Sequence, residues 1–279
     1  MINFIKKIEE DDNLGGIMIS VIISVYNRYD FLYLVLKSIE NQSFKDFEVI
    51  IAEDCEKEEM KENIIKWKKE FSFKIKHVYQ EDVGFRKCKI LNEAIKIADK
   101  NMVVIDGDCL LHYKFLENYN KYFEKGYDVI FGKRCEMSKK LTENLLLETR
   151  CKVRLLELIF PYSKAWTECV YFPLITNTKK RGLTLLGSNM GFTKKAIYKI
   201  NGFNEEYQLP GVGEDSDLEW RFKKVNVRYI ALKNTIVQYH LWHKTSGNHN
   251  TGKNWKILEK SYEENRWYAK DGIKKEKIL

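Results

Sequence analysis

The residues best suited to chemistry are carboxylates and histidines in three short segments. Asp106-Gly107-Asp108 follows the apolar run Met102–Ile105, while Gly213-Glu214-Asp215-Ser216-Asp217 and His240-Leu241-Trp242-His243 lie far downstream. Two carboxylates one residue apart can hold magnesium or manganese and leave coordination positions open for a diphosphate. Because 40 of the 279 residues are acidic, such pairs also arise by chance on solvated surfaces, so the position after a buried strand carries the prediction.

The elements that must position these residues alternate between short β-branched runs and amphipathic segments. This alternation predicts a largely parallel sheet with right-handed crossovers, and therefore a ligand crevice at the carboxyl ends of the strands. The expected strands are Met18–Val25, Phe47–Ala52, Lys74–Tyr79, Met102–Ile105 and Tyr127–Gly132, and the expected helices between them are Phe31–Asn41, Met60–Phe71 and Lys87–Asp99.

The pattern is looser in the second half of the chain. Helical stretches are expected over Ser138–Ile159, Lys194–Ile200 and Ser216–Val225, and a surface helix over Trp255–Lys270. Strands are expected over Leu185–Phe192 and within Tyr229–Tyr239. The fold class is therefore α/β.

Composition favours one globular domain, because 44% of the residues are hydrophobic and only 3 prolines and 15 glycines are present. The six cysteines are scattered without a Cys-x-x-Cys pair, which fits a reducing compartment. The chain lacks an apolar run of about 18 residues, and its N-terminus is charged where a secretory signal would be apolar. We therefore expect a cytoplasmic protein that is soluble or at most peripheral to the membrane.

The net charge is +8, with lysines concentrated between Lys253 and Lys277. Such a surface suits a polyanion, an anionic membrane or an anionic substrate, and a solvated lysine-rich surface explains it more simply. We find no nucleic-acid-binding motif, so the charge and the aromatic residues alone support no nucleic-acid partner.

Four polar segments are expected to converge, because each begins where a predicted strand ends. In an open α/β sheet, an aromatic ring, a carboxylate and a metal pair at these ends could contact the base, ribose and diphosphate of a nucleotide. The alternative is that Tyr26 is a core aromatic residue and Asp54 an ordinary turn residue. The segments are Ser24-Val25-Tyr26-Asn27, Glu53-Asp54, Asp106-Gly107-Asp108 and Gly187-Ser188-Asn189.

Three further features have both a functional and a structural interpretation. Arg86 and Lys87 follow a glycine turn at a helix start, which suits phosphate binding or a plain helix cap. Asp215, in a glycine-flanked loop, is a candidate general base, whereas Asp217 could simply cap the next helix. His240 and His243 would point to opposite faces of a strand but could converge in a turn, so we expect one metal ligand rather than two.

As an ordered set, these stretches resemble inverting nucleotide-sugar glycosyltransferases of the GT-A type, family 2, in the branch that includes chondroitin-polymerase catalytic domains. The resemblance covers roughly residues 18–245, and its last third is also similar to the β-1,4-galactosyltransferase pattern of Asn-Gly-Phe, Gly-Glu-Asp and a metal-binding His. The stretches are Ser20–Asn27, Glu48–Asp54, Asp82–Lys87 with Asn92, Asp106–Asp108, Gly187–Phe192, Asn201–Glu205 and Gly213–Asp217.

The resemblance implies a GT-A fold, with a Rossmann-like nucleotide-sugar-binding half, a mixed and mainly parallel central sheet, and an acceptor-binding half. Residues 1–17 would form an N-terminal extension, and residues 18–250 a single domain. Within it, residues 18–132 would bind the nucleotide and residues 133–250 the acceptor. Residues 251–279 would form a basic helical tail able to contact an anionic membrane.

The resemblance also implies roles for individual residues. Tyr26 would stack on uracil, and Asp54 would accept a hydrogen bond from the uracil imide. Glu214 would hold the acceptor hydroxyl and Asp215 would take its proton. The remaining residues of the donor site would be Ser24, Asn27, Arg86, Lys87, Asp106 and Asp108, and the metal ligands would be Asp108, Asp106, His243 and His240, with His243 favoured over His240.

Two residues depart from the family pattern. Val25 stands where many relatives have proline, and Glu53 replaces the first aspartate of the usual pair. Both bear on loop shape and base preference and leave the expected fold unchanged.

The sequence thus predicts an inverting glycosyltransferase that depends on manganese or magnesium. It would transfer a sugar from a UDP-sugar to a glycan or lipid-linked glycan in the synthesis of a bacterial-type surface polysaccharide, capsule or lipopolysaccharide. A non-catalytic nucleotide-sugar-binding partner of a glycan polymerase is the alternative.

Overall fold

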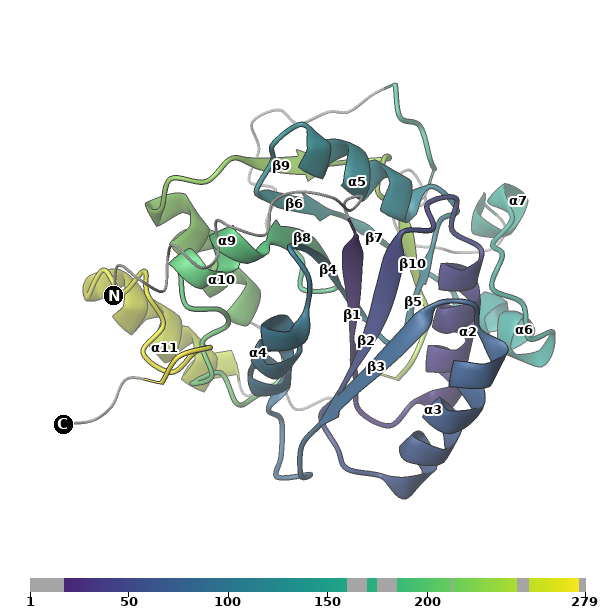
Figure 1. Cartoon of the computed structure of the whole chain (residues 1–279), viewed down its shortest axis with the longest axis horizontal. Helices are drawn as coiled ribbons and strands as arrows, with labels where there is room; N and C mark the ends of the chain where they lie inside the picture. The colour runs from purple at the N-terminus through teal and green to yellow at the C-terminus, as the bar shows by residue number, and fades with distance from the viewer. Residues whose placement is uncertain (1–17, 160–169, 175–184, 212, 245–250, 276–279) are drawn as a thin grey trace.

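The computed structural model describes residues 18–159, 170–174, 185–211, 213–244 and 251–275. A seven-stranded sheet runs through the middle of the molecule, and a smaller three-stranded sheet continues from one end of it (Figure 1). The predicted extension over residues 1–17 lies outside the described residues.

The strand order of the large sheet is β3-β2-β1-β4-β8-β6-β9. The first four strands pair in parallel, β8 is antiparallel to both of its neighbours, and β6 and β9 are again parallel. The strands are β1 (Ile19–Val25), β2 (Phe47–Glu53), β3 (Lys74–Tyr79), β4 (Asn101–Asp106), β6 (Val129–Gly132), β8 (Asn189–Thr193) and β9 (Tyr229–Leu232).

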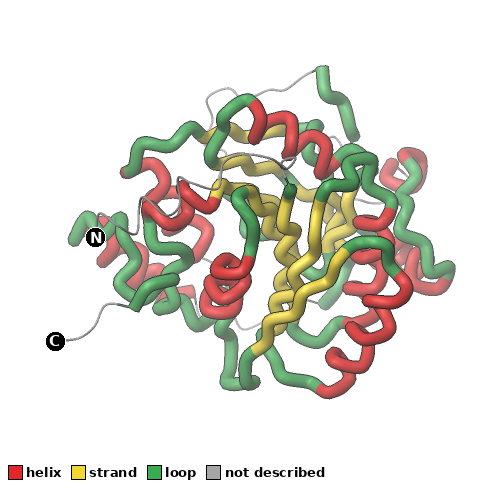
Figure 2. Tube along the Cα trace, in the orientation of Figure 1, coloured by secondary structure: helices red, strands yellow, loops and turns green. Residues whose placement is uncertain are grey.

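Helices cover both faces of this sheet, as the tube in Figure 2 shows. One apolar core joins the sheet to α2, α3, α5 and α6, and a second core joins the other face to α4, α9 and α10. The helices are α2 (Tyr29–Glu40), α3 (Glu58–Glu70), α4 (Lys87–Ile97), α5 (Phe115–Glu124), α6 (Lys139–Leu147), α7 (Leu155–Ile159), α9 (Lys194–Lys199), α10 (Glu214–Lys224) and α11 (Thr251–Glu263).

Alternating β1 residues supply the two cores, with Val21 and Ile23 in one and Ile22 in the other. Successive side chains of a strand point to opposite faces, so a sheet covered on both faces needs an uninterrupted apolar run. The predicted α/β class with a mixed, mainly parallel sheet is therefore confirmed.

The antiparallel direction of β8 corrects one expectation. Gly187 and Ser188 do not follow a strand end but precede β8, whose first residue, Asn189, pairs with Ile105 near the end of β4. Because β8 runs in the reverse direction, its amino end rather than its carboxyl end places these residues at the predicted crevice.

The small sheet has the order β5-β10-β7 and comprises β5 (Cys109–Leu111), β10 (Gln238–His240) and β7 (Arg134–Glu136). The sequence analysis did not predict β5, β7 or α5. The stretch expected to be helical over Ser138–Ile159 is divided into α6 and α7, because Thr149 takes a left-handed backbone conformation with φ of 50°.

The C-terminal segment is helical only in its first half, which corrects the predicted helical tail and the helix expected over Trp255–Lys270. The helix α11 ends at Glu263, and Asn265 then adopts a φ of 51°, a left-handed conformation that stops the helix. The chain beyond α11 is irregular as far as residue 275. Among the described residues, no helix is long and apolar enough to span a membrane.

Candidate active site

The small sheet brings one carboxylate and one imidazole together. Asp108 occupies the turn between β4 and β5, and antiparallel pairing places Cys109, the first residue of β5, opposite His240 at the end of β10. On the other side of β10, parallel pairing places Glu136 beside His240. Two strand pairings therefore hold His240 between Asp108 and Glu136.

His243 reaches the same carboxylate from the chain that follows β10. The Nε2 atoms of His240 and His243 each lie 3.3 Å from Oδ2 of Asp108. The three side chains offer ligand atoms within 4.8 Å of one another. The strand β10 ends at His240, so the alternation of side chains between the two faces of a strand does not apply to His243. The two imidazoles can therefore converge, as they could in a turn.

This donor set fits a divalent metal ion. One carboxylate oxygen and two imidazole nitrogens leave positions open for further ligands, and the mixture of nitrogen and oxygen suits a transition metal better than calcium. The other ring nitrogen of His240, Nδ1, lies 2.6 Å from Oε2 of Glu136. A carboxylate in this position orients an imidazole that binds metal and increases its basicity.

The charges of this cluster shift its pKa values in opposite directions. Although burial opposes ionisation, hydrogen bonds to His240 and His243 lower the pKa of Asp108. Burial disfavours the imidazolium of His240, yet Asp108 and Glu136 raise its pKa to about 9. Despite its own burial, Glu136 has a pKa lowered to about 2, mainly by His240. The carboxylates therefore favour protonated imidazoles, and a metal ion must displace those protons when it binds.

Asp106, the other carboxylate of the pair, contacts cations instead of the histidines. Its Oδ1 accepts a hydrogen bond of 2.7 Å from Nζ of Lys87, at the start of α4, and its Oδ2 lies 4.0 Å from Nη1 of Arg134. Although burial disfavours the ammonium, Asp106 and then Asp215 raise the pKa of Lys87. Lys87 thus links the end of β4 electrostatically to Asp215, in the segment Gly213–Asp217.

Asp215 lies in the first turn of α10 and faces the start of β8. Its Oδ2 accepts a hydrogen bond of 2.8 Å from the backbone N–H of Gly187. A Cβ atom at position 187 would collide with the Asp215 carboxylate, so only glycine allows this approach. The turn before α10 requires glycine as well, because Gly213 has a φ of 112°.

The surroundings of Asp215 favour its protonated form. Burial, and then repulsion from Glu214, raise the pKa of Asp215 to about 7, while Lys87 acts in the opposite direction. A carboxylate with a pKa near neutral pH is suited to accept a proton and to return it. Oε2 of Glu214 is buried and accepts no hydrogen bond from the described residues.

Asp217 does not cap helix α10, which corrects the capping role that the sequence suggested for it. The helix begins two residues earlier than expected, at Glu214, and its N-cap Gly213 makes no side-chain hydrogen bond. Oδ2 of Asp217 instead accepts a hydrogen bond of 2.7 Å from Nε of Arg221, and both side chains are 1% exposed. Asp217 therefore belongs to a buried ion pair.

The residues predicted to contact the base lie at the ends of β1 and β2. The ring of Tyr26 is 48% exposed, so it is not a core aromatic residue, and its hydroxyl donates a 2.8 Å hydrogen bond to Asp82. Asp54 is buried and accepts hydrogen bonds from Nε2 of Gln80 at 2.5 Å and from the backbone N–H of Arg86 at 2.7 Å. A carboxylate has about four acceptor positions, so Asp54 retains capacity for a ligand.

Ser24 and Asn27 flank Tyr26 at the same edge of the sheet. Ser24 pairs with Asp106 across the two parallel strands, and its carbonyl oxygen accepts a 2.8 Å hydrogen bond from Gly107. Asn27 is exposed. The predicted donor-site residues of β1, β2 and β4 thus share one edge of the sheet, as the convergence of strand ends requires.

The sequence analysis missed Glu136, Arg134 and Gln80 as contributors to the site. Glu136 and Arg134 lie in a three-residue strand, which is too short to show a periodic pattern. The only local signal for Gln80 was its place in the turn before Arg86. The structure therefore adds an acidic partner for His240, a cation beside Asp106 and an amide beside Asp54.

Comparison with known proteins identifies relatives along most of the chain. Residues 20–200 match the model for glycosyl transferase family 2, and residues 176–245 match the N-terminal domain of galactosyltransferase. The chain is 25% identical over 241 residues to a chondroitin synthase from Escherichia coli and 26% identical over 233 residues to one from Pasteurella multocida. These matches cover 80% and 75% of this chain but only 34% and 23% of the two synthases.

Solved structures support the same fold. TarS 1–349 from S. aureus in complex with UDP-GlcNAc superposes with a TM-score of 0.59 at 18% identity, over 84% of this chain and 60% of that one. The mannosyltransferase PcManGT from Pyrobaculum calidifontis, in complex with GDP-Man and Mn2+, gives a TM-score of 0.55 at 16% identity, over 86% and 60%. The predicted family and GT-A fold are confirmed: the chain belongs to glycosyl transferase family 2.

Proposed function

We propose that the protein is a metal-dependent, inverting glycosyltransferase that moves a sugar from a UDP-sugar to the hydroxyl of a glycan acceptor in polysaccharide synthesis. One observation carries the proposal. The Asp106–Lys87 pair at the end of β4 is flanked by a cluster of potential metal ligands and by Asp215, a carboxylate with a pKa of about 7. A cation site and a proton acceptor are the two parts that this transfer requires.

Asp108, His240 and His243 would hold the metal ion, with Glu136 orienting His240. Of manganese and magnesium, manganese suits two imidazole ligands better. A bound divalent ion supplies positive charge that stabilises the departing diphosphate. Lys87 adds a fixed positive charge next to Asp106.

On the donor side, Tyr26, Asp54 and Asn27 would contact the base, and Ser24, Arg86 and Asp106 the rest of the nucleotide. The exposed ring of Tyr26 supports a stacking role. The remaining acceptor capacity of Asp54 supports recognition of an N–H group on the base, such as the imide of uracil.

On the acceptor side, Glu214 would accept a hydrogen bond from the acceptor hydroxyl and Asp215 would take its proton. The oxygen then forms a bond to the anomeric carbon, and the bond from that carbon to the diphosphate breaks, with its electron pair leaving on the nucleoside diphosphate. Attack from the face opposite the leaving group inverts the anomeric configuration. The buried, unpartnered Oε2 of Glu214 supports its part in this step.

Release of UDP from a panel of UDP-sugars, measured with and without Mn2+, tests the proposal. We expect slow hydrolysis of one donor that EDTA abolishes and Mn2+ restores. Full activity without metal, or an Asp108→Ala variant that retains both Mn2+ binding and turnover, would refute metal dependence. Binding of a UDP-sugar without any turnover in the presence of glycan acceptors would support the non-catalytic alternative.

A further inference from the structure

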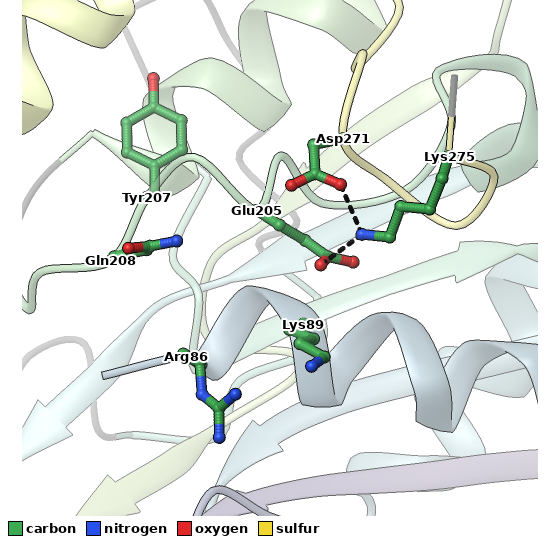
Figure 3. Close-up of a pocket in the computed structure, with 7 residues that line it drawn as sticks. All are labelled: Arg86, Lys89, Glu205, Tyr207, Gln208, Asp271 and Lys275. Atoms are coloured by element: carbon green, nitrogen blue, oxygen red, sulfur yellow. Dashed lines mark hydrogen bonds and ion pairs between the residues drawn. The ribbon is translucent and has the colours of Figure 1, made fainter. Parts of the chain in front are cut away.

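A hollow lies at the first turn of α4, on the side of this helix that faces the C-terminal segment. It has a volume of about 350 Å3. Figure 3 shows that its walls come from three parts of the chain: the first turn of α4, the loop before α10 and the irregular segment after α11. Its lining includes Arg86, Lys89, Glu205, Gln208, Asp271 and Lys275.

The C-terminal wall is built into the domain and held in place. The side-chain amide of Asn201 donates hydrogen bonds to the carbonyl oxygens of Ala269 and Lys274, at 2.6 and 2.9 Å, and its Oδ1 accepts one from the backbone of Lys274 at 2.8 Å. The backbone N–H of Glu205 donates to the carbonyl of Asp271. The segment therefore has a fixed position against the turn that contains Asn201.

The same turn is fixed to α4. Asn92, in the middle of that helix, exchanges hydrogen bonds with the backbone of Phe203 and donates to Oε1 of Glu205 at 2.8 Å. Asn92 is fully buried and Glu205 is 7% exposed. The three walls of the hollow are therefore cross-linked by buried hydrogen bonds.

The cations of the hollow are only partly neutralised. Lys275 donates 2.5 Å hydrogen bonds to both Glu205 and Asp271, so these carboxylates already share one ammonium. Lys89 is half-buried, yet it forms no ion pair with any described residue. Its ammonium therefore has hydrogen-bond donors available to an anion that enters the hollow.

Arg86 supplies a second cation without a carboxylate among the described residues. One nitrogen of its guanidinium donates to the carbonyl oxygen of Glu81, and Nε is buried without an acceptor. The guanidinium keeps its full positive charge because a carbonyl oxygen is neutral. Arg86 and Lys89 therefore present two positive charges on one side of the first turn of α4.

The hollow is connected along the chain to two parts of the proposed transfer site. Arg86 immediately precedes Lys87, the partner of Asp106. Gln208 is seven residues before Asp215, and an extended chain of that length spans at most about 25 Å. An acceptor glycan whose terminal hydroxyl reaches Asp215 can therefore place another part of its chain in this hollow.

We propose that the hollow is a subsite for an anionic group of the acceptor, either the carboxylate of an acidic sugar or a phosphodiester, and that Lys89 binds this group. The inference rests on the proposed function and narrows its substrate class to acidic glycans. A neutral glycan would leave the Lys89 ammonium without a counter-charge, whereas a carboxylate or phosphate would receive charge-assisted hydrogen bonds.

Calorimetric titration of the full chain, saturated with UDP and Mn2+, tests this subsite. The probes are a chondroitin hexasaccharide, the same hexasaccharide with its carboxyl groups reduced to alcohols, and a glycerol phosphate hexamer. We expect one of the two anionic probes to bind and the neutral derivative to bind at least about tenfold more weakly. The anionic probe that binds identifies the source of the charge.

Variants of α4 provide the matched comparison. Lys89→Gln is expected to weaken binding of the anionic probe about tenfold or more, Lys89→Arg to retain it, and Lys96→Gln, on the same helix but outside the hollow, to match the wild type. A thermal melting temperature equal to that of the wild type establishes that each variant is folded.

Three results would overturn the subsite: equal affinity for the acidic and neutral hexasaccharides, no binding of either anionic probe, or unchanged affinity in Lys89→Gln. Each of these results can occur whether or not the proposed function is correct, because that function is tested by the Mn2+-dependent release of UDP from a donor without acceptor. Retained UDP release with no anionic binding would reject the subsite alone.

Discussion

Asp108 and Asp215 are two shielded carboxylates near the end of β4, and their surroundings give them opposite acid–base behaviour. Two imidazoles hold the pKa of Asp108 below its usual range, whereas burial and Glu214 raise the pKa of Asp215 to about 7. The first remains ionised at every pH where the protein would work, and the second changes its protonation close to neutral pH. Neighbouring charges, rather than residue type, therefore suit Asp108 to binding a cation and Asp215 to accepting a proton.

The two regions also differ in construction. Strand pairing in the small sheet fixes Asp108, His240 and Glu136, whereas Asp215 depends on a helix start and a glycine N–H. Strand pairing fixes residues in register, which suits a set of ligands that must meet at one point. Asp215, at a helix start, lies beside the loop to which the proposed function assigns the acceptor.

The largest effect is expected at Asp215. Replacement by Asn keeps the shape of the side chain but removes its ability to accept a proton, so we expect acceptor-dependent turnover to fall about 10²- to 10⁴-fold. Calorimetric affinity for the donor in the presence of Mn2+ should remain, because the proposed function gives Asp215 no part in donor binding. Asp46→Asn, an exposed carboxylate, is the matched control.

If Asp215→Asn retained turnover, Asp215 would not be the base. An equal loss of donor affinity would instead mean that its main contribution is to the donor side through Lys87. Product analysis gives an independent check, since a β-linked product from an α-linked donor requires attack from the face opposite the diphosphate.

A large effect on stability is expected two residues away, at the Asp217–Arg221 pair. Arg221→Met leaves Asp217 buried without its cation, which costs about 3–5 kcal/mol of unfolding free energy. Denaturant unfolding measures this loss, and Lys96→Met, which removes the partner of the exposed Glu93, should cost less than about 1 kcal/mol. A small loss in Arg221→Met would mean that Asp217 finds another partner or takes up a proton.

A smaller effect is expected at Glu136, the carboxylate that contacts the proposed metal ligand His240. Glu136→Gln keeps a hydrogen-bond partner for His240 but removes the negative charge, so we expect Mn2+ affinity to fall about 10- to 100-fold. Competition between the protein and a chelator measures the change. A Glu143→Gln variant, on the exposed face of α6, should bind Mn2+ as the wild type does.

The same affinity measurement ranks the two histidines. We expect both His240→Ala and His243→Ala to weaken Mn2+ binding, because each imidazole lies equally close to Asp108. Loss of affinity in only one variant would identify a single nitrogen ligand, as the sequence alone favours for His243.

The sequence was sufficient for those parts of the fold that local pattern determines. The apolar runs of β1, β2 and β4 must be buried strands, because each is covered on both faces. The polar residues that follow them converge because parallel strands end at one edge of a sheet. The order of residues along the chain is therefore enough to bring Asp106, Asp54 and Tyr26 to that edge.

The parts that failed depend on contacts between distant segments. The pairing of His240 with Cys109 and Glu136 joins residues more than 100 positions apart through three-residue strands, whose length shows no periodicity. The direction of β8 is likewise decided by tertiary packing, as is the burial of the Asp217–Arg221 pair, whose two residues lie one turn apart on α10. For the same reason, the sequence could not indicate that the C-terminal segment forms a wall of the hollow beside α4.

The smallest expected effect is a shift in the pH profile, and it contrasts Asp215 with Asp108 directly. A general base acts only when it is deprotonated, so the rate should rise with pH through about 7, the raised pKa of Asp215, and level off above it. Glu214→Gln removes the neighbouring negative charge and should move this midpoint to lower pH, whereas Lys87→Gln removes a positive charge and should move it to higher pH. Both substitutions also lower the maximal rate, but the midpoint does not depend on that rate. Saturating Mn2+ at each pH keeps the Asp108 cluster fully occupied, so protonation of His240 and His243 does not contribute to the curve. Opposite shifts in the two variants would identify Asp215 as the titrating group, and an unchanged midpoint in both would assign the rise to a different residue.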